Sequence, residues 1–146
     1  VRHREHVDRT TRQKMQIAKE EKLSIISAQL VDLGLTFTEV DLERHFLLLR
    51  MNGSRFVPDD EYLEWAGAWL LKLRAANQHA LRYPPQAFAQ VVGAIWLRVC
   101  RQASRQLGWT AWRKLWQSPL RAEVCLRVSQ QLFSELRERI PVWTRG

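Results

Sequence analysis

The sequence feature that most strongly predicts helical structure in this chain is a regular stripe of apolar residues between Pro58 and Pro84. The stripe recurs at intervals of 3, 4, 4, 3 and 4 and consists of Tyr62, Trp65, Trp69, Leu73, Ala76 and Ala80. This is the period of one helix face and not of a strand. Pro58 suits the first position of such a helix, and Tyr83-Pro84-Pro85 ends it because proline cannot continue the hydrogen-bond ladder. The segment between the prolines is therefore predicted to be a helix with a packed aromatic face.

The same period and the same kinds of stop predict helices along the rest of the chain. They are expected over residues 9–33, 38–51, 58–82, 85–107, 110–117 and 119–140. Thr38 with Asp41 resembles a capping pair, and Gly93 within its helix indicates a close helix crossing. No segment alternates like a strand. We therefore predict an all-α fold, a single compact domain of five or six helices with a partly projecting basic N-terminal helix.

The first predicted helix is polar in its first half and apolar in its second half. Residues 10–22 read TTRQKMQIAKEEK, whereas Leu23, Ile26, Leu30 and Leu33 repeat at helical spacing. Residues 1–8 are polar and are expected to be mobile or to depend on a partner. We therefore divide the 146 residues into a basic N-terminal arm, residues 1–20, and a helical domain, residues 21–146.

Charge is distributed unevenly along the chain, whose formal net charge is +8. Residues 1–19 carry +4, residues 20–64 carry −6, residues 65–97 carry +3 and residues 98–146 carry +7. Two basic ends thus flank an acidic middle. This distribution is typical of a protein that meets a polyanion on one side and a different partner on another.

The stretch from Arg98 to Trp116 combines cations with large aromatic residues. Arg98, Arg101 and Arg105 fall at i, i+3 and i+7, on a single helix face that can neutralise phosphates. The candidate nucleic-acid-binding residues are Arg98, Arg101, Arg105, Arg113, Lys114, Arg121 and Trp112. Trp109, Trp112 and Trp116 follow at spacings of 3 and 4, and we expect at least two of them to be buried. The arginines are then the outward-facing part of the interface.

A protein partner is predicted for two other sets of charges. A half-polar helix usually rides on another protein or on nucleic acid, and the acidic middle of the chain suits a basic partner. The candidate partner-binding residues are Arg9, Arg12, Lys19, Glu39, Glu43 and Glu64. Self-association stays open as well.

Residues that could support catalysis or hold a metal are scattered. His3 and His6 lack a companion ligand, the two cysteines are far apart, and the glycines occur singly without a phosphate-binding loop. The acids around Asp60 fit the positive end of a helix. We therefore expect no enzyme, no metal and no cofactor. The cysteine usage and the lack of a long apolar run favour a cytoplasmic protein with no membrane contact.

In size, basic ends and acidic middle, the chain resembles the small accessory replication proteins of temperate phages, including helicase loaders. The resemblance implies that the basic face from Arg98 onward meets DNA. It also implies that the helical arm and the acidic residues recruit a larger enzyme such as a replicative helicase. The expected function is therefore that of an accessory or loader factor in phage or plasmid DNA replication.

Two other interpretations stay open. Leu107-Gly108-Trp109-Thr110 is similar to the turn of bacterial repressor-type helix-turn-helix proteins, in which glycine permits the turn and the following Ser or Thr caps the recognition helix. That resemblance implies a transcriptional regulator that binds a specific duplex sequence. The second interpretation is a protein-interaction module or inhibitor that does not bind nucleic acid.

Overall fold

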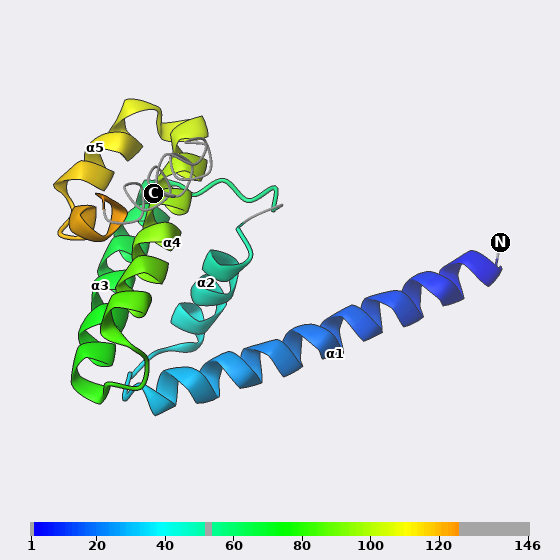
Figure 1. Ribbon diagram of the computed structural model, residues 1–146. Coiled ribbons are helices and arrows are strands. Elements are labelled where there is room, and N and C mark those ends of the chain that lie inside the picture. Colours follow the sequence, from blue (N-terminus) through cyan, green and yellow to red (C-terminus); the bar gives the residue numbers. More distant parts are fainter. Residues whose placement is uncertain (1, 52–53, 126–146) are drawn as a thin grey trace, which may run out of the picture. The chain divides into compact units, whose positions relative to one another are not determined.

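The computed structural model describes residues 2–51 and 54–125, with side chains described from Asp8 onward. Its helices are α1 (Arg2–Asp32), α2 (Glu39–Leu49), α3 (Asp60–Ala80), α4 (Pro85–Leu107) and α5 (Trp109–Gln117), and a helical segment over residues 121–125 follows (Figure 1). These described ranges hold no β-strand, so the predicted all-α fold is confirmed for them. Contacts group the chain into two compact units, residues 1–47 and 48–146. The boundary at residue 20 stays a prediction.

Helix α1 of the first unit is 31 residues long, which corresponds to about 46 Å. It begins at Arg2 rather than at Arg9, so residues 2–8 are helical, and their expected mobility or dependence on a partner stays a prediction. The physical reason for the earlier start is that no proline or glycine interrupts the sequence before Gly34. Gly34, with φ of 76°, follows the end of the helix as predicted.

Among the described side chains of α1, buried residues occur only in its second half. Ile26 and Leu30 are buried, as is Leu33 directly after the helix, whereas every side chain from Asp8 to Ala18 is exposed. Met15 is 69 % exposed, although it shares the helical spacing of the buried leucines. The predicted contrast between a polar first half and a packed second half is therefore confirmed for these residues.

A reciprocal pair of hydrogen bonds caps α2. The Thr38 backbone N–H donates to Asp41 Oδ2 at 2.9 Å, and the Asp41 backbone N–H donates to Thr38 Oγ1 at 3.2 Å. Each side chain thus satisfies a backbone donor that lacks a partner inside the helix. The capping pair predicted from the sequence is confirmed, with an aspartate in place of the more usual glutamate.

Helix α3 of the second unit begins two residues later than Pro58 suggests. Asp59 is the N-cap, and its carboxylate accepts a hydrogen bond from the Tyr62 backbone N–H at 2.8 Å. The Asp59 carboxylate determines the start of the helix, because it accepts a hydrogen bond from a backbone N–H of the first turn, which the side chain of Pro58 cannot do. Pro58 lies before the helix and is buried.

The turn from α3 to α4 is closed by the buried side chain of Asn77. Its Oδ1 accepts from the Tyr83 backbone N–H at 3.0 Å, and its Nδ2 donates to the Tyr83 carbonyl at 3.1 Å. Leu81 ends α3 in the left-handed region, with φ of 50° and ψ of 33°. Pro85 then opens α4 and Gly108 ends it, as predicted.

The core of the second unit lies mainly between α3 and α4. The buried side chains of these two helices include Tyr62, Leu63, Trp69, Leu70, Leu73, Val92, Ile95, Trp96 and Val99. Trp65 is half-buried and stacks on Trp69 at 5.5 Å between ring centroids. The predicted aromatic face of α3 is thus a packing face. On α4, the neighbouring Val91 and Val92 differ, since Val91 is 52 % exposed and Val92 is buried.

Residues 121–125 pack closely against α4. A Cβ added to Gly93 would lie 2.6 Å from the carbonyl carbon of Glu123, so only glycine fits this crossing. The close approach predicted at Gly93 is therefore confirmed. The carboxylate of Glu123 also pairs with the Arg74 guanidinium from α3. Leu120 and Val124 are buried, while residues 126–140 of the helix predicted over residues 119–140 lie outside the described residues.

Candidate nucleic-acid interface

The arginines of α4 divide into an exposed pair and a partly buried third. Arg101 and Arg105 are exposed, whereas Arg98 is half-buried. The Nε atom of Arg98 is buried and has no hydrogen-bond partner among the described residues. The predicted arginine face is therefore fully exposed at two of its three positions, and the binding role of Arg98 stays a prediction.

Helix α5 turns its tryptophans outward. Trp109 is 72 % exposed and Trp116 is 51 % exposed, while Trp112 is half-buried. The expectation that at least two of these rings are buried is wrong. The buried residues of α5 are Ala111 and Leu115, which lie on the opposite side of the helix from Trp109 and Trp116.

The exposed side of α5 carries a cation between two aromatic rings. Trp109, Arg113 and Trp116 fall at i, i+4 and i+7, so they share one face. All three are exposed, and we call them the α5 outer face. Trp112 is the ring selected from the sequence in this helix. The spacing of Trp109, Arg113 and Trp116 places the other two rings on one face with a cation, but it does not determine whether that face is exposed.

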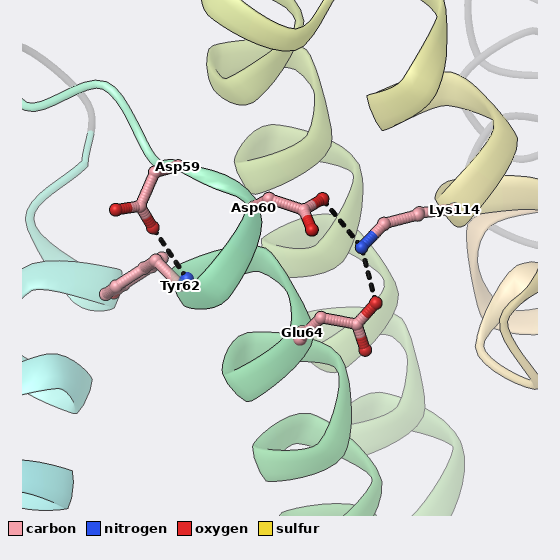
Figure 2. Close-up of polar contacts among 5 residues, drawn as sticks. All are labelled: Asp59, Asp60, Tyr62, Glu64 and Lys114. Carbon is pink, nitrogen blue, oxygen red and sulfur yellow. Dashed lines mark hydrogen bonds and ion pairs between the residues drawn. The ribbon is translucent and has the colours of Figure 1, made fainter.

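Lys114, next to Arg113 in the sequence, has a different environment. Its ammonium group lies 2.7 Å from Asp60 Oδ1 and also pairs with the carboxylate of Glu64 (Figure 2). Partial burial lowers the pKa of Lys114, but the hydrogen bonds and charges of Asp60 and Glu64 more than offset this and raise it overall. Lys114 and Glu64, predicted to contact nucleic acid and a protein partner respectively, thus join α5 to the start of α3.

Cations outnumber acids throughout this part of the second unit. Between Trp65 and Ala122 the sequence contains nine Lys and Arg residues and no Asp or Glu. Arg74 and Lys114 are held in ion pairs. Arg101, Arg105, Arg113 and Arg121 are exposed and form no ion pair with any residue that the structure describes. The guanidinium groups of these last four residues therefore lie at the surface of the described part of the second unit.

The predicted partner-binding residues of the first unit are exposed or paired with one another. Arg9, Arg12 and Glu39 are exposed. Lys19 forms an ion pair with Glu43 at 3.1 Å and lies 5.8 Å from the ring centroid of Phe46. Lys19 and Glu43 thus hold α1 to α2, and the binding role of the whole set stays a prediction.

Cys100 and His45 are titratable side chains that are buried in the part of the chain that the structure describes. Burial raises the pKa of the Cys100 thiol to about 12 and lowers the pKa of His45 to about 4, so both are uncharged at neutral pH. Over the described ranges, 2–51 and 54–125, no group of three or more His, Cys, Asp or Glu side chains is arranged to hold a metal ion.

Thr110 does not cap α5. The helix begins at Trp109 with Gly108 as its N-cap, and no side chain makes a capping hydrogen bond there. The capping role that the helix-turn-helix resemblance implied for Thr110 is therefore wrong. Gly108 alone joins α4 to α5, with φ of 55° and ψ of −127°, a conformation that favours glycine.

No protein-family model matches the sequence, and no match was found among curated proteins or among solved structures. Among the helices that the structure describes, none is both long enough and apolar enough to cross a lipid bilayer.

Proposed function

We propose that this protein binds nucleic acid, with DNA as the expected ligand, through the exposed arginines of α4 and α5, and that it catalyses no reaction of its own. The proposal rests chiefly on Arg101, Arg105 and Arg113, which are exposed within a stretch that carries nine cations and no acid. Exposed surface cations of this kind gain most from a polyanion, because each phosphate contact releases condensed counterions.

The wider role that we propose is that of an accessory or loader factor in phage or plasmid DNA replication. Such a factor needs a second surface for a larger protein, such as a helicase. The first half of α1 supports this role because its side chains from Asp8 to Ala18 are exposed on a continuous helix. Arg9 and Arg12 form no ion pair with any described residue, which leaves them available to an acidic surface.

The binding proposal is tested by fluorescence anisotropy with labelled DNA across a salt series. The double variant Arg101→Ala/Arg105→Ala should weaken binding and reduce the slope of log K against log salt by roughly 1.4 to 1.8, as expected for two lost phosphate contacts. Arg9→Ala/Arg12→Ala is the matched control, since it removes the same charge from α1 and should leave the slope unchanged.

The other outcomes are equally informative. Equal losses in the two double variants would show that net charge, and not the α4 surface, governs binding. Strong preference for one duplex sequence would favour the transcriptional regulator. Absence of binding at low salt would overturn the proposal in favour of a protein-interaction module.

A further inference from the structure

The two exposed tryptophans of the α5 outer face lie on the side of the helix opposite to its buried residues. Ala111 and Leu115 provide its buried side, and Lys114 ties it to Asp60 and Glu64 of α3. Trp109 nevertheless exposes 72 % and Trp116 51 % of its surface. Large aromatic surface left in water without a packing role commonly marks a binding site.

Arg113 and the charge of the surrounding chain narrow the kind of ligand. Arg113 lies one helical turn from each tryptophan, so a cation separates the two rings. No acid occurs between Trp65 and Ala122, which disfavours a basic partner. Flat apolar rings combined with exposed guanidinium groups match a ligand that offers both π faces and phosphates.

We propose that Trp109 and Trp116 stack on unpaired bases of a single polynucleotide strand, while Arg113 contacts the phosphate backbone between them. This inference rests on the proposed function and specifies its ligand. The two rings are seven residues apart on one helix, a rise of about 10 Å. At that separation they take different bases rather than enclosing one base from both sides.

A single strand fits this face better than a duplex does. In a duplex the base faces are covered by their neighbours, and proteins read only base edges through hydrogen bonds and small apolar contacts. Indole rings offer large stacking surfaces but a single N–H donor each. Unpaired bases expose the π faces that such rings use, largely regardless of sequence.

The test compares a thymidine 20-mer, a uridine 20-mer and a mixed-sequence 20-base-pair duplex, with anisotropy and tryptophan emission measured together. Both single strands should bind more tightly than the duplex and quench the emission. Trp109→Ala and Trp116→Ala should each weaken single-strand binding roughly 5- to 150-fold. Trp109→Phe and Trp116→Phe, which keep an aromatic face, should lose much less.

Folding and charge are controlled separately. Circular dichroism should show unchanged helicity in the four variants, because the rings are exposed. Weakening by Arg101→Ala/Arg105→Ala together with undiminished binding in the Trp→Ala variants would overturn stacking and leave the proposed function standing. Tighter binding to the duplex would also overturn the single-strand assignment. Absence of binding to all three oligonucleotides would overturn both proposals.

Discussion

Helices α3 and α5 both carry tryptophans at helical spacing, but those of α3 lie on the packed face of their helix and Trp109 and Trp116 of α5 lie on the exposed face. On α3, Trp69 is 3 % exposed and stacks on Trp65 within the second unit. On α5, Trp109 and Trp116 face outward, and the small Ala111 is buried instead. A small residue on the buried side lets a short helix lie close to its neighbour, which leaves no room there for indole rings.

The contrast shows that helical periodicity groups residues onto faces without determining which face is buried. On α3 the opposite side carries Leu71 among polar and small residues, so burial of the aromatic face removes far more apolar surface from water. On α5 both sides offer apolar residues, Ala111 and Leu115 on one and Trp109 and Trp116 on the other. Neighbouring helices then decide the orientation, and the ion pair of Lys114 with α3 favours the observed one.

The largest expected difference in stability is between two variants that each lack one tryptophan ring, one on α3 and one on α5. Trp69→Ala should lower the free energy of unfolding by about 3–5 kcal/mol, because it leaves a cavity in the core. Trp116→Ala should change it by no more than about 0.5 kcal/mol. Urea denaturation followed by circular dichroism measures both. Comparable losses in the two variants would contradict the assigned orientation of α5.

A smaller effect is expected where α4 meets residues 121–125. Gly93→Ala should destabilise the protein by about 1–3 kcal/mol, since the new Cβ would meet the Glu123 backbone and overpacking outweighs the gain in helix propensity. Gly67→Ala is the control, because its Cβ would meet only the edge of the Trp96 ring at 3.2 Å. The Gly93→Ala variant should have a midpoint temperature of thermal unfolding well below that of Gly67→Ala. The reverse order would rule out the close crossing.

The smallest effect concerns the ion pairs that join α5 to α3. Lys114→Met keeps most of the aliphatic stem and removes the charge, and it should cost about 0.5–1 kcal/mol at low salt because Asp60 and Glu64 are exposed. The same substitution at Arg113, which forms no ion pair with a described residue, should be nearly neutral. Denaturant melts at low and high salt measure the difference, and an equal cost at both salt concentrations would exclude an electrostatic origin.

Much of the helical framework follows from local chemistry and was predicted from the sequence. The ends of α4 at Pro85 and Gly108, the Thr38–Asp41 cap and the close approach at Gly93 each depend on one residue type with few alternatives. Helix α3 starts at Asp60 and not at the predicted Pro58. The Asp59 carboxylate accepts a hydrogen bond from a backbone N–H of the first turn, and this fixes the start of the helix.

The composition of the candidate site was less predictable because it depends on tertiary contacts. Arg101 and Arg105 are exposed as expected, whereas Arg98 is half-buried. The pairing of Lys114 with Asp60 and Glu64 joins residues about 50 positions apart in the sequence, and no local pattern indicates it. The exposure of Trp109 and Trp116 could not be predicted for the reason given above, since it depends on which apolar side of α5 packs.

The single-residue connection at Gly108 has a thermodynamic consequence for any ligand of this surface. With one residue between α4 and α5, the directions of the two helices are coupled, and Leu115 is fully packed at 1 % exposure. The backbone entropy of arranging Arg105 and the α5 outer face is therefore lost when the protein folds and not when the ligand arrives. A preorganised surface of this kind can bind a flexible chain while only the ligand becomes ordered.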